Sequence, residues 1–249
     1  SGTDLTVYGL TVGRGAGAIA TNTVLGASAL ASNSTGTLNI AIGANANKST
    51  TGSNNIGIGQ YTLGGNAAGA TGSSNTGVGD YTMFQLTSGA SNVAMGQSSQ
   101  QYTSTGSYNT SVGLGSLLNN STASNNTAVG YQAGYTNTTS NGVTVFGYQA
   151  GYFLGAGNTA LGYQSMYGSS GAGGYNNTAV GQQSLFSNTN GLYNVAVGHD
   201  SLRSNTTAGT NVAVGYQSLY TYSNGSGGTV AIGYQAGYTT NGAYGVYIG

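Results

Sequence analysis

The sequence predicts an all-β fold, namely a parallel β-solenoid of about fifteen coils with roughly 17 residues in each coil. A short motif, Asn126-Thr127-Ala128-Val129-Gly130, recurs in degenerate form throughout the chain. Its glycine falls at positions 13, 26, 43, 59, 79, 96, 113, 130, 147, 162, 181, 198, 215, 233 and 249. Seven of the fourteen intervals are 17 residues, and the rest range from 13 to 20. A steady period with one structural unit per repeat is typical of solenoids. Abundant glycine and the lack of a 3.6-residue period argue against helices.

The residues before the repeat glycine read as a short strand. The position directly before it, as in Val129, is apolar in every copy, and the position three before it is Thr, Val, Ile or Leu. These two positions share one face of a strand, and we predict that the Val129 column faces the solenoid interior. The position between them is mostly Ala or Gly, so the opposite face is also apolar. Soluble monomers rarely expose a long apolar stripe, which predicts a homo-oligomer.

A second apolar column follows the repeat glycine. Three residues after the glycine comes Ala, Ser or Thr, and the next residue is usually Leu or Met. Three copies place Gly134, Gly151 or Gly237 there instead, each followed by a tyrosine. We interpret that tyrosine as the large core residue moved by one place. Each coil should then consist of a strand, a tight turn, a second strand and a looser turn.

The glycine and asparagine columns predict the turns and the contacts between coils. The repeat glycine lies where the chain must turn, and glycine adopts a positive φ without steric cost. A second glycine, as in Gly52, often lies seven residues earlier and indicates the other turn. Asparagine starts eleven of the fifteen copies. Stacked coils would place these side chains above one another, where they can form hydrogen bonds along the stack.

The repeats leave no room for a second kind of domain. We predict a single β-solenoid domain over residues 1–249, with irregular capping repeats in residues 1–30 and regular repeats in residues 31–249. The 13-residue interval between the first two copies is the shortest, as expected for a capping end. The chain stops within a repeat at Gly249, which suggests a fragment or a processed product.

Composition excludes several classes of function. Only six side chains carry a formal charge and the net charge is zero, so we expect no nucleic-acid partner and no membrane insertion. One histidine, three aspartates and no cysteine are too few ligands for a metal site. We expect no cofactor and no enzymatic activity.

The core Asn194-Val195-Ala196-Val197-Gly198, followed by Ser201, resembles the head repeats of YadA-like trimeric autotransporter adhesins. The longer run that continues as Gly130-Tyr131-Gln132-Ala133-Gly134-Tyr135 is similar to repeats of phage tail fibres. The resemblance covers residues 10–249 and implies a left-handed parallel β-roll and a homotrimer. The 17-residue period and the tyrosines differ from the adhesin head, and the chain carries neither a coiled-coil stalk nor a membrane anchor.

One column of tyrosines is the best candidate for ligand contact. Its members follow the repeat glycine, and each precedes a glutamine: Tyr131, Tyr148, Tyr163, Tyr216 and Tyr234. Such a ladder of rings and amides could stack on sugar rings and bind their hydroxyl groups. The alternative, which we favour, is that the tyrosines stack on each other and stabilise the coils.

Other motifs fit ordinary repeat positions better than functional sites. His199-Asp200 is the only histidine beside a carboxylate, but His199 occupies the tyrosine column. Arg14-Gly15-Ala16-Gly17 and Gly113-Leu114-Gly115 lack the following helix of a phosphate loop. Glycosylation sequons such as those at Asn120 and Asn137 are expected by chance in this composition.

Seven strands begin with threonine, at positions 23, 76, 110, 127, 144, 159 and 178. This column could form an ordered flat array, as in ice-binding solenoids. Its alternation with Val and Ile suits a buried position better.

These observations predict a structural, receptor-binding segment of a phage tail fibre or a similar extracellular fibre. It would act by rigid multivalent display at the virion surface or outside the cell, with a cell-surface glycan or another host receptor as partner. The alternatives are the head of a bacterial trimeric surface adhesin and an ice-binding β-solenoid.

Overall fold

The computed structural model describes residues 4–64, 69–168, 174–223, 226–240 and 242–249. The chain divides into two compact units, Ser1–Asn126 and Thr127–Gly249. Unit 1 contains β1 (Leu5–Val7), β2 (Leu10–Gly13), the 3-10 turn η1 (Ala16–Ala18), β3 (Thr23–Leu25), β4 (Ile40–Ile42), β5 (Ile56–Ile58), β6 (Thr76–Val78), β7 (Val93–Met95) and β8 (Thr110–Val112). Unit 2 contains β9 (Thr127–Val129), β10 (Thr144–Phe146), β11 (Thr159–Leu161), β12 (Thr178–Val180), β13 (Val195–Val197), β14 (Val212–Val214), β15 (Val230–Ile232) and β16 (Val246–Ile248).

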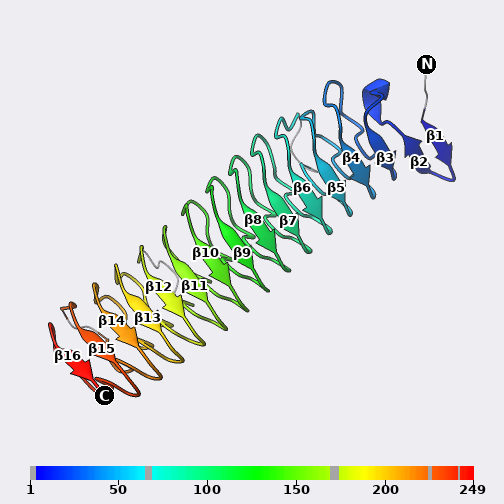
Figure 1. The fold of residues 1–249 in the computed structure, drawn as a ribbon. Coiled ribbons are helices and arrows are strands. Elements are labelled where there is room, and N and C mark those ends of the chain that lie inside the picture. The colour runs from blue at the N-terminus through cyan, green and yellow to red at the C-terminus, as the bar shows by residue number, and fades with distance from the viewer. Residues whose placement is uncertain (1–3, 65–68, 169–173, 224–225, 241) are drawn as a thin grey trace. The chain divides into compact units, whose positions relative to one another are not determined.

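The predicted parallel β-solenoid is confirmed. Within each unit the strands from β3 onward lie side by side in sequence order, each in the next coil (Figure 1). Their register follows the repeat, because Ala179 pairs with Ala196 and Ala196 with Ala213. The described parallel turns number about 13 rather than fifteen, with a spacing of about 17 residues.

The first repeat copy is not a coil, which accounts for part of this difference. Strand β2 pairs antiparallel with both β1 and β3. Tyr8 and Gly9 between β1 and β2 have φ of 49° and 82°, as in the two-residue turns that favour hairpins. The motif before Gly13 therefore belongs to a hairpin that pairs with the edge of β3.

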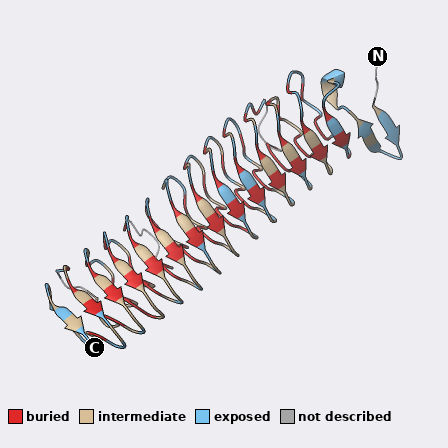
Figure 2. Ribbon diagram, viewed as in Figure 1, coloured by how far each residue is buried: buried red, intermediate tan, exposed pale blue. Residues whose placement is uncertain are grey.

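The prediction that the Val129 column faces inward is wrong. In β9 the middle residue Ala128 is fully buried, whereas Thr127 and Val129 on either side are half-buried. The same pattern repeats in both units, with buried strand centres and more exposed strand ends (Figure 2). The interior leaves little room at the centre where a leucine lies opposite, since a Cβ on Gly77 would lie 2.9 Å from Thr82 Oγ1 and 3.4 Å from Leu63 Cγ. The larger buried centres Val24 and Val145 lie opposite Gly15 and Gly151 instead. The larger residues at the two ends of the strand therefore point outward.

The second predicted strand of each coil is replaced by consecutive turns. The residues two and four places after the repeat glycine have positive φ, as in Gln183 at 52° and Leu185 at 52°. This conformation costs a non-glycine residue about 1–2 kcal/mol. Burial of the leucine side chain, worth about 1.5–3 kcal/mol, offsets that strain. Leu185, Leu202 and Leu219 are all fully buried and form the wide part of the core.

The tyrosines that follow Gly134, Gly151 and Gly237 do not replace the missing core leucine, contrary to the prediction. Tyr135, Tyr152 and Tyr238 are half-buried at the outer surface. The core volume is restored elsewhere: Leu154 and Val145 occupy the space over Gly151, where a Cβ would lie 2.7 Å from Val145 Cγ1. Tyr247, in a position usually held by Ala or Gly, approaches Gly237 in the same way.

The predicted asparagine ladder is confirmed. In unit 1 the backbone N–H of Asn92 donates to Asn75 Oδ1 at 3.0 Å, and that of Asn109 donates to Asn92 Oδ1 at 2.9 Å. The Asn92 amide also donates to the Gly106 carbonyl at 2.9 Å. The ladder continues within unit 2 through Asn177, Asn194 and Asn211. Each buried amide therefore connects adjacent coils.

We expect Asn92→Ala to lower the free energy of unfolding by roughly 3 kcal/mol. The substitution leaves the Asn109 N–H and the Gly106 carbonyl without their side-chain partner inside a buried stack, and each such loss costs about 1–3 kcal/mol. Urea denaturation measures the change. The exposed Asn190→Ala is the matched control, and equal effects of the two substitutions would contradict a ladder role for Asn92.

Candidate functional site

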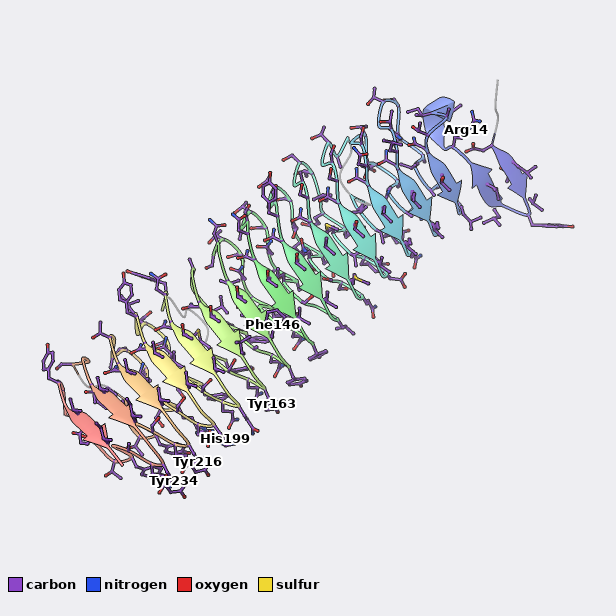
Figure 3. All side chains as sticks on the ribbon, in the orientation of Figure 1. Arg14, Phe146, Tyr163, His199, Tyr216 and Tyr234 are labelled. Carbon is purple, nitrogen blue, oxygen red and sulfur yellow. The ribbon has the colours of Figure 1, made fainter. Side chains whose placement is uncertain are left out.

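The tyrosine column lies on the outside of unit 2, directly after the strands. One backbone hydrogen bond per coil aligns it. In each coil, the residue two positions after the repeat glycine donates its backbone N–H. The acceptor is the backbone carbonyl of the tyrosine-column residue in the preceding coil. Examples are Gln149 to Tyr131 at 2.8 Å, Gln164 to Tyr148 at 2.9 Å and Gln235 to Tyr216 at 2.8 Å. Figure 3 shows Tyr163, His199, Tyr216 and Tyr234 following one another on the same side of unit 2. We call this the outer column: Tyr131, Tyr148, Tyr163, Gln182, His199, Tyr216 and Tyr234.

The rings of the outer column stack on each other. Ring centroids are 5.1 Å apart for Tyr131 and Tyr148, and 5.2 Å for Tyr148 and Tyr163, with interplanar angles of 17° and 9°. Tyr216 and Tyr234 lie 5.4 Å apart at 11°. The faces of an interior ring such as Tyr148 are therefore covered by its neighbours, while edges and hydroxyl groups remain exposed. Glycan contact by these tyrosines stays a prediction.

The glutamines beside the outer column form a row of their own. Gln149 donates to Gln132 at 2.9 Å, Gln164 to Gln149 at 3.1 Å and Gln183 to Gln164 at 3.3 Å. Each amide still has donor or acceptor capacity left over, because an amide offers two N–H groups and two lone pairs. The row holds the coils in register and presents partly satisfied amides next to the rings.

A second aromatic column was missed in the sequence. It lies five residues after the repeat glycine and consists of Tyr135, Tyr152, Tyr167, Phe186, Arg203, Tyr220 and Tyr238. Tyr135 and Tyr152 stack at 5.0 Å, and Tyr167 and Phe186 at 5.3 Å. The guanidinium of Arg203 lies 5.2 Å from the Phe186 ring centre and 5.8 Å from that of Tyr220, which continues the stack by cation–π contact. The signal that could have found this column is the recurrence of aromatic residues at one fixed offset.

Hydroxyl groups from both columns affect the pKa of Tyr152. Burial raises the pKa of the Tyr152 hydroxyl, and the neighbouring hydroxyls of Tyr135, Tyr167 and Tyr131 add to this effect. Tyr131 belongs to the outer column, and the other two belong to the second. The aromatic residues of both columns therefore contribute to one surface.

His199, Asp200 and Arg203 form a polar cluster. His199 Nδ1 lies 3.1 Å from Asp200 Oδ2, and Arg203 Nε lies 3.1 Å from Asp200 Oδ1. The His199 ring stacks on Tyr216 at 5.5 Å, as the other members of the outer column do on their neighbours. The hydroxyl of the adjacent Ser201 donates to the Gly198 carbonyl, like the equivalent hydroxyl of Ser218 to Gly215. The cluster therefore follows the geometry of the repeat.

The weaker motifs occupy structural positions. The N–H groups of Arg14 and Gly15 donate to the carboxylate of Asp4 at 2.6 and 2.8 Å, so these donors are already occupied. The sequon residues Asn120 and Asn137 are buried, and their amides donate to the carbonyls of Ala123 and Ser140. Among the described residues, no group of three His, Cys, Asp or Glu side chains is arranged to hold a metal ion.

Comparisons with known proteins return no relative. No protein-family model matches the chain. No curated protein and no solved structure matches it either. In the described part of the chain, no helix has the length and apolar character required to cross a membrane.

Proposed function

We propose that the chain is a non-enzymatic, homo-oligomeric fibre segment of a phage tail fibre or a similar extracellular fibre. The observation that carries this proposal is the outward direction of the large apolar strand residues. In β13, for example, Val195 and Val197 flank the buried Ala196 from the outside. From β3 to β15 the strand centre is buried and the residue before the repeat glycine is apolar and more exposed, whereas the first strand residue is threonine in seven of these strands.

Another copy of the same chain is the partner that fits this surface. A parallel copy presents the same pair of outward residues at the same coil spacing, so apolar side chains meet in every coil. The chain has only six formally charged side chains, which leaves no charged shell to keep such a surface in water. The number of three chains comes from the resemblance of the repeats to trimeric adhesin heads and tail fibres.

Multivalent display is the mechanism that follows. Parallel chains repeat any weak receptor contact several times, and linked contacts add by avidity without new chemistry. The aromatic surface of unit 2 is the candidate contact surface, with a host-cell glycan as candidate receptor. The adhesin head shares this mechanism, and a membrane anchor elsewhere in the full-length gene product would favour it over the fibre.

The proposed interface can be tested by placing charged residues at outward-facing strand positions and measuring the mass of the oligomer. We expect Val197→Asp combined with Val214→Asp to reduce the oligomer toward a single chain, because the interface would bury unpaired carboxylates. Sedimentation velocity measures the mass. Asn190→Asp adds one carboxylate at an exposed position and should leave the oligomer intact. An oligomer that survives the double substitution would contradict the proposed interface.

One further observation favours ice binding as a second candidate. Thr127, Thr144, Thr159 and Thr178 pair in register on adjacent strands, and they point outward rather than into the buried position that the sequence predicted. The apolar neighbours of these threonines vary in size from Val129 to Phe146, which makes the surface uneven. A thermal-hysteresis measurement separates this candidate from the fibre.

A further inference from the structure

The outer column is interrupted once in unit 2. The residue that follows Gly181 is Gln182, where the neighbouring coils carry rings. Gln183 N–H donates to the Tyr163 carbonyl at 2.9 Å, and Asp200 N–H donates to the Gln182 carbonyl at 2.9 Å. These bonds place Gln182 between Tyr163 and His199 in the column. The interruption therefore lies inside the stack of coils.

The interruption leaves two ring faces without an aromatic neighbour. In the described part of the chain, Tyr163 stacks only on Tyr148, and His199 stacks only on Tyr216. Tyr163 and His199 are two coils apart, which corresponds to roughly 10 Å at about 4.8 Å per strand. Stacked rings in this column lie 5.1–5.5 Å apart, so this separation equals the place of one missing ring.

The Gln182 side chain can leave that place at low cost. It is exposed, and its amide forms no hydrogen bond with a residue that the structure describes. Displacing this side chain therefore breaks no hydrogen bond with the described part of the chain. The second column has no such gap in the coil that contains Gln182. Phe186 occupies the equivalent position there, and the Arg203 guanidinium lies over its ring. The opening is thus confined to the outer column.

We propose that a neutral saccharide ring binds at Gln182, between the free faces of Tyr163 and His199. This inference rests on the proposed function and names the position at which its glycan receptor would bind. The C–H groups on the apolar face of a pyranose carry partial positive charge and are attracted to the negative face of an aromatic ring. The hydroxyl groups at the edge of the sugar would meet the Gln182 amide and the remaining capacity of the Gln164 and Gln183 amides.

The local charges favour an uncharged ligand. Among the residues that the structure describes, the charged side chains beside the position are Asp200 and Arg203, which pair at 3.1 Å. His199 contacts the same carboxylate. A stacked interior ring such as Tyr148 offers a sugar no free face. The proposal therefore assigns binding to the interruption and not to the number of tyrosines.

The experiment adds a ring where the column lacks one. Cellohexaose, chitohexaose and maltohexaose are the probes, and saturation-transfer NMR at millimolar concentration is the measurement. We expect at least one probe to bind the wild-type chain with transfer from Tyr163. Gln182→Tyr should weaken that binding at least tenfold, because its ring fills the position. Gln182→Ala should retain binding, and Tyr163→Ala should lose it.

Gln97→Tyr is the matched control, since it adds a tyrosine one residue after the repeat glycine Gly96 in unit 1 and should leave binding unchanged. Stronger binding by Gln182→Tyr, or no binding of any probe by the wild-type chain, would overturn the proposal. The oligomer mass is measured on the same samples. A wild-type chain that is oligomeric but binds no probe rejects only this inference, whereas a monomeric wild-type chain that binds a probe rejects the fibre interface.

Discussion

Gly130→Val is expected to lower the free energy of unfolding by at least about 3 kcal/mol. Gly130 has a φ of 130°, a conformation that strains any other residue by about 1–3 kcal/mol. A Cβ at this position would also lie 2.7 Å from the carbonyl carbon of Gly147 and even closer to its oxygen. That backbone belongs to the next coil, so relief of the clash requires the coils to separate.

Gly142→Val separates the cost of backbone strain at a positive φ from the cost of a steric clash with the next coil. Gly142 has a φ of 68°, but a Cβ there would meet no atom within 4 Å. We expect this control to lose only about 1–2 kcal/mol from left-handed backbone. Urea denaturation of both variants gives the difference. If Gly142→Val destabilises the chain as much as Gly130→Val, the close approach of adjacent coils at the repeat glycine is not what requires glycine.

Ala196→Asp is expected to unfold the chain or to lower the free energy of unfolding by about 3–5 kcal/mol. The Ala196 side chain is fully buried, with Ala179 and Ala213 above and below it in the adjacent coils. A carboxylate there has no room and no partner, and an unpaired buried charge is among the most destabilising of substitutions.

Val197→Asp is the matched comparison because it makes a similar change one residue away. Val197 points outward and is half-buried. We expect it to change the melting temperature much less than Ala196→Asp does, and to act on the oligomer instead. Thermal melts followed by circular dichroism measure both. A larger loss for Val197→Asp would restore the sequence-based prediction that the column before the glycine faces inward.

The coil register could be predicted because it depends on glycine and asparagine, and each of these residue types has one main structural role in the repeat. Glycine at position 130 and its equivalents marks a positive φ, and the asparagine column marks hydrogen bonds along the stack. Both columns can be recognised in the sequence without knowing which residues lie in the neighbouring coil. The hairpin of β1 and β2 was missed because the motif before Gly13 looks like a repeat copy, while the Tyr8-Gly9 turn that redirects it lies outside the motif.

The direction of the strand faces could not be predicted from apolarity, since both faces are apolar. What decides it is the width of the interior: leucines such as Leu185 fill it from the turn side and leave space for a small residue in the strand, whereas the larger Val145 lies opposite Gly151. Those leucines have positive φ, which their identity does not suggest. The signal for this conformation lies in the rarer copies that place Gly115, Gly134 or Gly151 at the same offsets.

The candidate site was predicted in part. The five tyrosines of the outer column do lie in one column, with stacked neighbours as the favoured alternative required. The second aromatic column and the open position at Gln182 depend on which rings cover each other, and this is a property of adjacent coils rather than of any one motif.

The molar mass of the wild-type chain in solution tests the central claim most directly. The outward apolar residues of both units predict an oligomer, and the resemblance predicts three copies of the 24.5 kDa chain. Multi-angle light scattering after size-exclusion chromatography, at micromolar concentration, gives this mass without a label. We expect a single species of about three times the chain mass with a β-rich circular dichroism spectrum. A stable, folded monomer of 24.5 kDa under the same conditions would contradict the account.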